Sequence, residues 1–65
     1  MLEQNVDAKN QNLLKVKDVA TILNISRSFA YSLMQSGQLR IVRLGHSVRV
    51  RPEDLEQFIS ENVSK

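Results

Sequence analysis

The sequence contains no cysteine and a single histidine, His46, and both scarcities exclude kinds of chemistry. Without cysteine there is no disulfide to staple the fold and no thiolate to bind a metal. One histidine on its own completes neither a metal site nor a nucleophile–base pair. The two glycines are too few for a glycine-rich phosphate loop. We therefore expect no metal, no cofactor and no enzymatic activity.

Long hydrophobic runs are also missing. Apolar residues follow one another for at most two or three positions, whereas a membrane-spanning helix needs about 20. We therefore expect neither a membrane span nor a signal peptide. Residues 1–12 are polar and lack apolar periodicity, which predicts a disordered tail. Residues 13–63 are expected to form one domain, whose small core must consist of well-placed aliphatic side chains.

Acidic residues are absent from residues 19–52, which hold all five arginines of the chain. Residues 1–18 balance three acids against three lysines, and residues 53–65 have a net charge of −3, from four acids and Lys65. A basic centre beside an acidic end favours a polyanion as partner, because the guanidinium fork suits phosphates and base edges. A solvated basic surface is the plain alternative. The arginines are Arg27, Arg40, Arg43, Arg49 and Arg51.

Two short helices are predicted after an extended lead-in at residues 13–16. The first spans residues 17–23, and Asn24 is suited to the left-handed conformation that ends it. Ser26 is a good N-cap for a second helix over residues 27–36, which the following glycine ends. Two helices joined by so short a turn predict a helix-turn-helix.

The second helix has distinct faces when its residues are placed about 100° apart. Ala30, Leu33 and Met34 form its predicted buried stripe. Phe29 lies on one flank, and we expect it to extend the core, since an aromatic residue at helical spacing usually packs. The positions away from the core are Ser28, Ser32 and Gln35, with Tyr31 on the other flank.

A basic hairpin is predicted over residues 40–51. Two runs of alternating character flank Gly45-His46-Ser47, a turn in which glycine supplies a positive φ. One face is predicted to be aliphatic and to close the core, and it comprises Val42, Leu44, Val48 and Val50. The opposite face is predicted to comprise Ile41, Arg43, Arg49 and Arg51.

A last helix is predicted to follow the hairpin, opened by proline and two acids. Its apolar stripe, which is expected to cover the core, comprises Leu55, Phe58, Ile59 and Val63. Its acidic outer face, expected to turn away from any polyanion, carries Glu53, Glu56 and Glu61. Arg51 can pair with Glu53 or Asp54. Arg40 and Arg51 lie at the ends of the hairpin, and both rank below Arg43 and Arg49 as contacts to a polyanion.

Four motifs occur in order along residues 13–59: "LLKVKDVATIL", "ISRSFAYSLMQSGQL", "VRLGHSVRV" and "RPEDLEQFI". Together they resemble the small MerR-like winged-helix domains of the excisionase family. The resemblance implies an α+β winged helix-turn-helix, with three short helices and a two-stranded wing. It also implies that the second helix enters the major groove of double-stranded DNA, while the wing follows the minor groove or its phosphates. The matching DNA-contacting positions are Arg27, Ser28 and Tyr31 on the helix, and Arg43, His46, Ser47 and Arg49 on the wing.

The sequence departs from this family at several of these positions. Ser32 stands where the family often has a basic residue, and Phe29 where it often has a small one. Phe29 either contacts a thymine methyl or extends the core, and we favour the core. The exposed helix face of Ser28, Ser32 and Gln35 is therefore neutral, and we expect base reading by it to be modest. His46-Ser47 replaces two residues that are often basic, which weakens the expected grip on phosphates.

The resemblance implies a sequence-specific DNA-binding protein that acts as an excisionase, or recombination directionality factor. Such a protein bends attachment-site DNA in several cooperating copies and so assists a tyrosine integrase. MerR-type regulators add a dimerising helix and an effector-sensing part; only fourteen residues follow Arg51, so we expect neither, and no small-molecule effector. The alternative on the same fold is a small transcriptional regulator of a prophage, plasmid or other mobile-element operon. A protein-interaction module built on the last helix is a third hypothesis. A DNA-binding role places the protein in the cytoplasm, at the nucleoid.

Overall fold

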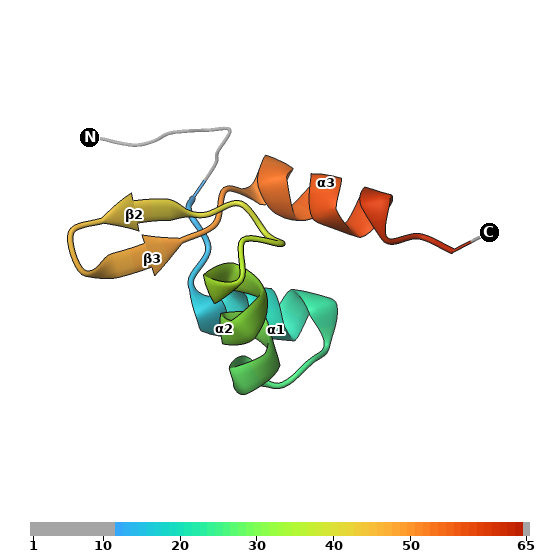
Figure 1. Cartoon of the computed structure of the whole chain (residues 1–65), viewed down its shortest axis with the longest axis horizontal. Helices are drawn as coiled ribbons and strands as arrows, with labels where there is room; N and C mark the ends of the chain where they lie inside the picture. The colour runs from blue at the N-terminus through green and yellow to red at the C-terminus, as the bar shows by residue number, and fades with distance from the viewer. Residues whose placement is uncertain (1–11, 65) are drawn as a thin grey trace.

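The computed structural model describes residues 12–64, which form three helices and a two-stranded hairpin (Figure 1). The elements are α1 (Val16–Leu23), α2 (Arg27–Gln35), β2 (Val42–Leu44), β3 (Ser47–Arg49) and α3 (Pro52–Glu61). This is the small α+β winged helix-turn-helix that the sequence predicts. The predicted tail lies outside the described residues, apart from the exposed Asn12. None of the described helices is both long and apolar enough to cross a bilayer.

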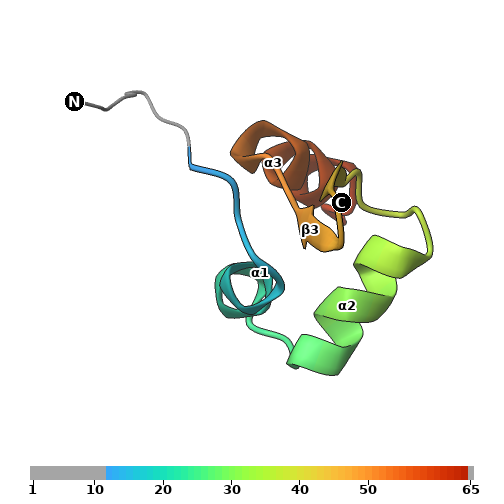
Figure 2. The same cartoon turned by 90° about the vertical axis from the view of Figure 1, so that its left-hand side faces the viewer.

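The helix-turn-helix consists of α1 and α2, and local hydrogen bonds define its turn. Asn24 ends α1 in the left-handed conformation, at φ 58° and ψ 50°. Ser26 caps α2, because its Oγ accepts a hydrogen bond from the backbone N–H of Phe29 at 3.1 Å. Gly37, at φ 86°, lies just beyond the end of α2. Figure 2 shows α1 nearly end-on with α2 crossing beside it. The helix boundaries predicted at this turn are confirmed.

The core lies where the helix pair, the base of the hairpin and α3 meet. Its largest fully buried side chains are Leu39, Val19 and Val50. Leu14 in the lead-in and Val50 exchange two backbone hydrogen bonds, of 2.8 and 2.9 Å, which tie the start of the domain to the end of the hairpin. The stripe predicted on α2 is confirmed, with Ala30, Leu33 and Met34 all buried.

The hairpin has a register that differs by one residue from the predicted one. Its cross-strand pairs are Val42 with Arg49, Arg43 with Val48, and Leu44 with Ser47. The turn therefore contains two residues, Gly45 and His46, and Ser47 belongs to β3. Gly45 has φ 63°, which suits the first position of a two-residue hairpin turn.

This register shows that the predicted faces of the first strand were wrong. Cross-strand partners share a face, and a shift of one residue turns a strand over. The face toward the core therefore carries Ile41, Arg43, Val48 and Val50, of which the three aliphatic residues belong to the core or pack against it. The other face of the hairpin carries Val42, Leu44, Ser47 and Arg49. Leu44, predicted to close the core, is 51% exposed.

Two further packing predictions were wrong in part. Leu55 is buried and Phe58 packs against the core, but Ile59 and Val63 are 40% and 64% exposed. In Figure 1 the C-terminal turns of α3 extend past the helix pair, so the end of the predicted stripe has little to cover. Phe29 is not a core residue but is 53% exposed. It lies at the edge of the buried stripe of α2, beside a hollow that α3 does not close.

Candidate nucleic-acid interface

The recognition-helix residues predicted from the sequence all lie on the exposed surface of α2. Ser28, Ser32 and Gln35 are spaced so that they share the face opposite the buried stripe. Arg27 is exposed at the first turn, and Tyr31 is 52% exposed. This face is polar and uncharged apart from Arg27, so it offers hydrogen-bonding groups with little net charge.

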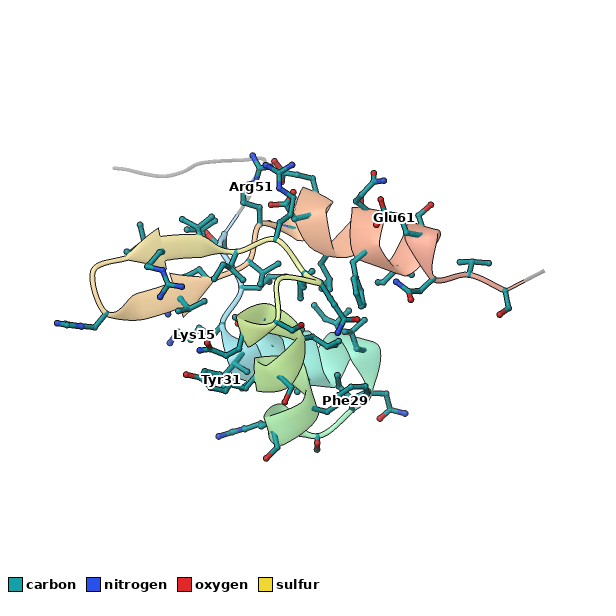
Figure 3. All side chains as sticks on the ribbon, in the orientation of Figure 1. Lys15, Phe29, Tyr31, Arg51 and Glu61 are labelled. Carbon is teal, nitrogen blue, oxygen red and sulfur yellow. The ribbon has the colours of Figure 1, made fainter. Side chains whose placement is uncertain are left out.

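A cleft of ≈ 320 Å³ separates α2 from the wing and gathers residues from both elements. Tyr31 of α2 lines it together with Met34, and Figure 3 shows the Tyr31 side chain extending toward the side of the hairpin. From the wing, the lining residues include His46, Ser47 and Arg49. The structure therefore brings Tyr31 and three of the four predicted wing residues together in one place.

The two wing arginines differ in their surroundings. Arg49 is half-buried, and its Nη1 donates a hydrogen bond to the carbonyl oxygen of Val48 at 2.9 Å. Arg43 is exposed and lies on the opposite face of the hairpin, beside Val48. It does not line the cleft. The wing thus carries one guanidinium on each face. The prediction from the sequence, which put both on the same face, was wrong.

A polar hollow at the turn of the helix-turn-helix adds residues that the sequence prediction missed. Lys17, Thr21 and Asn24 of the first helix and its cap line it together with Arg27. The Thr21 hydroxyl donates to the backbone carbonyl of Lys17 at 2.9 Å. In helix-turn-helix proteins the first helix crosses the DNA backbone, so two cations at this point suit a phosphate. The sequence prediction missed Lys17 because residues 1–18 have no net charge, and net charge does not show where a single lysine lies in the fold.

Arg51 is held by acids of α3, as its position in the sequence predicted. Its Nε donates to Oδ2 of Asp54 at 2.7 Å, and its Nη2 donates to Oδ1 at 2.9 Å. A weaker ion pair joins Arg51 to Glu53 at 3.5 Å. The hydrogen bond from Arg51 holds the pKa of Asp54 below its usual value, although burial acts the other way, and the charges of Arg51 and Arg40 lower it further. The same hydrogen bond raises the pKa of Arg51.

None of the acidic residues of α3 lines the cleft between α2 and the wing. Glu53, Glu56 and Glu61 are exposed, and Gln57 donates a hydrogen bond to Glu61 at 2.9 Å. Figure 3 shows Arg51 and Glu61 on the side of the molecule opposite Tyr31. The molecule therefore has a basic and polar side, formed by α2 and the wing, and an acidic side, formed by α3. Within residues 12–64 no three histidine, cysteine, aspartate or glutamate side chains are grouped to hold a metal.

These features define a winged helix-turn-helix whose second helix is exposed on one face and whose wing carries arginines. The chain belongs to the helix-turn-helix domain family, whose model matches residues 13–63. Membership of this family supports sequence-specific DNA binding, and such domains are typically not enzymes. No curated protein and no solved structure matches the chain.

Proposed function

We propose that this protein is a MerR-like excisionase that binds and bends attachment-site DNA and thereby helps a tyrosine integrase to excise a mobile element. The observation that carries DNA binding is the cleft in which Tyr31 of α2 meets His46, Ser47 and Arg49 of the wing. The more specific role is supported by the resemblance of residues 13–59 to the excisionase family. Several copies act together on adjacent sites.

The proposed DNA complex follows from the shape of the interface. The exposed face of α2 lies in the major groove, which is wide enough for a helix. Ser28, Ser32 and Gln35 meet base edges there, and Arg27 lies at the entry of the helix. The wing lies along the neighbouring minor groove. Because Arg43 and Arg49 are on opposite faces of the ribbon, each reaches the phosphates of a different strand.

Phosphate contacts also come from the turn of the helix-turn-helix. Lys17 and Arg27 lie in one polar hollow beside the first turn of α2. A helix N-terminus favours negative charge, so a phosphate placed there is stabilised by Lys17 and by backbone N–H groups, while Arg27 extends from the same hollow to the bases. Contacts at the wing and at this hollow hold the duplex at two separated places, which is the arrangement that bending requires.

Footprinting on the attachment site of a candidate element tests this function. We expect protection of adjacent direct repeats, a bend detected by circularly permuted DNA fragments, and stimulation of excision by the tyrosine integrase of that element. A stable dimer in solution that protects inverted half-sites would contradict the proposal. That result would favour the small transcriptional regulator, because a two-fold symmetric dimer matches a palindromic operator.

A further inference from the structure

Two hollows adjoin on the side of the molecule where α3 packs against the helix pair. The first is apolar and is lined mainly by Leu23, Ile25, Phe29, Leu33 and Phe58, with a volume of ≈ 350 Å³. The second has a volume of ≈ 420 Å³, and its charged lining residues include Glu53, Glu61 and Arg40. Gln38 and Phe58 line both hollows, so the two lie side by side, and together they are called the groove here, with an apolar half and an acidic half.

Large apolar side chains are exposed in and near the apolar half of the groove. Phe29 is 53% exposed, although it stands next to the buried stripe of α2. Beyond the hollow, Ile59 of α3 and Val63, which follows the end of α3, are also exposed, at 40% and 64%. Contiguous exposed apolar surface with a polar rim marks a site of protein interaction. The aromatic rings of Phe29 and Phe58 are anchors of the kind that interfaces favour.

The acidic half determines the charge of the occupant. Asp54 is engaged by Arg51, so its charge is largely matched within the domain. Glu53, which also pairs with Arg51 at 3.5 Å, and Glu61 are exposed in the same hollow. The three acids there outnumber Arg40 and the one arginine that pairs with two of them. Such a surface repels the phosphates of nucleic acid and attracts lysine or arginine. A partner that fills both halves must therefore combine large apolar side chains with cationic ones.

We infer that this groove binds a basic amphipathic helix of a second protein. Leucine or phenylalanine side chains of that helix enter the apolar half between Phe29 and Phe58, and its lysines or arginines meet Glu53 and Glu61. Recognition of an amphipathic helix by a hydrophobic groove needs both a stripe of anchors and charges at the rim, and the groove supplies both. The inference does not depend on the excisionase role.

The position of the groove leaves the candidate DNA interface accessible. Figure 3 shows Phe29 and Tyr31 extending from opposite flanks of α2, and only Tyr31 lines the cleft beside the wing. Glu61 of α3 also lies on the side away from Tyr31. The protein is therefore expected to hold DNA and the partner helix at the same time, so that it joins the partner to the DNA site.

A pair of synthetic peptides tests the groove. The first is a helix of about 18 residues with a leucine stripe flanked by lysines, and the second has the same stripe flanked by glutamates. When added to the ¹⁵N-labelled full chain, the lysine peptide is expected to shift the amide signals of Leu23, Phe29 and Phe58. It is expected to bind about tenfold more tightly than the glutamate peptide. Equal binding of both peptides, or shifts centred on Tyr31 and the wing, would overturn the inference.

Matched variants distinguish peptide binding in the groove from nonspecific hydrophobic binding. Phe29→Ser is expected to weaken lysine-peptide binding about tenfold, whereas Ile22→Ser is expected to leave it unchanged. Ile22 is also 53% exposed but does not line the groove, so it controls for loss of exposed apolar surface. Glu61→Lys is expected to weaken binding of the lysine peptide and to strengthen that of the glutamate peptide. Unchanged peptide affinity in Phe29→Ser, with loss of DNA affinity, would make Phe29 a DNA contact and contradict the groove.

Two other outcomes are distinguishable. Sedimentation of the full chain alone shows whether it associates with itself; association that Phe29→Ser abolishes would mean that a second copy occupies the groove, and would overturn a different protein as partner. DNA binding is measured separately with a duplex carrying the protected site. Peptide binding without DNA binding would leave the groove standing and contradict only the proposed function.

Discussion

Arg43 and Arg49 lie on opposite faces of the two-stranded wing, because Arg43 pairs with Val48 and Arg49 pairs with Val42. The cause is the two-residue turn, Gly45-His46, in place of the three-residue turn that the sequence predicts. The wing is therefore not a ribbon with one apolar and one basic side. It presents a cation in each direction, which suits an element that lies between the phosphates of two DNA strands.

The wing arginines are expected to contribute sequence-independent affinity for DNA. Arg43→Ala and Arg49→Ala should each weaken binding to all duplexes alike, and each should lower the slope of log K against log salt by about 0.9, the value for one lost phosphate contact. Titration of one specific and one unrelated duplex at several salt concentrations measures this. Arg40→Ala serves as the comparison, because Arg40 lines the acidic hollow of α3. An equal effect of all three substitutions would argue against a special role for the wing.

Acid is expected to destabilise the domain partly through Asp54. The pKa of Asp54 is lower in the folded chain than in the unfolded one, mainly because Arg51 donates hydrogen bonds to its carboxylate. The stabilisation is therefore complete above the ordinary aspartate pKa of about 3.9, and it is lost as the pH falls through the lower folded value. Asp54→Asn should reduce the urea midpoint at about pH 7 and should show a smaller further decline toward about pH 3 than the wild type.

Glu56→Gln is the matched control for this acid effect, since Glu56 is an exposed acid of the same helix. It should leave both the neutral midpoint and the acid decline close to those of the wild type. If Asp54→Asn and the wild type lost stability in parallel between the two pH values, the pair with Arg51 would not be the source of the acid sensitivity.

Stability is expected to depend on Leu39 far more than on Phe29. Leu39 is 1% exposed, so Leu39→Ala should lower the free energy of unfolding by about 2–5 kcal/mol, which is a large part of the stability of a small domain. Phe29 is 53% exposed, and Phe29→Ala should cost about 1 kcal/mol or less. Thermal unfolding followed by circular dichroism measures both. If Phe29→Ala lowered the free energy of unfolding as much as Leu39→Ala does, Phe29 would be a core residue.

The sequence predicted the helices well because their signals are local. Asn24 and Ser26 act through their own backbone neighbours, and the stripe of Ala30, Leu33 and Met34 needs only the helical period. The order of the elements followed from the same signals. The exposed polar face of α2 could also be predicted, because it is the complement of the buried stripe.

The remaining features depended on contacts that a single pattern does not specify. Val42, Arg43 and Leu44 alternate in the same way in either register, so only the length of the turn decides which of them face the core. The fate of Phe29 and Ile59 depends on how far α3 extends over the helix pair. Lys17 becomes a candidate phosphate contact only because the turn places it in the same hollow as Arg27.

The cap of α2 is expected to stabilise the domain without contacting DNA bases. Ser26 Oγ accepts the backbone N–H of Phe29, so Ser26→Ala should cost about 1 kcal/mol of the free energy of unfolding. Ser28→Ala, two residues along on the exposed face, should change stability by about 0.5 kcal/mol or less. Urea unfolding of the two variants provides the comparison. Equal losses would mean that the capping bond contributes little.

Sequence preference is expected to reside at Arg27 and Ser28, at the start of α2, and not at Lys17 in the adjoining hollow. Arg27→Ala and Ser28→Ala should change which bases are preferred, because each lost base contact removes about 1–3 kcal/mol of discrimination. Lys17→Ala should instead weaken all duplexes equally and reduce the salt slope by about 0.9, since Lys17 lies in the polar hollow where a phosphate is proposed to bind. Selection of bound sequences from a random duplex pool, carried out with each variant, separates the two effects. An unchanged preference in both Arg27→Ala and Ser28→Ala would place base reading elsewhere, because those side chains occupy the first exposed turn of the helix assigned to the major groove.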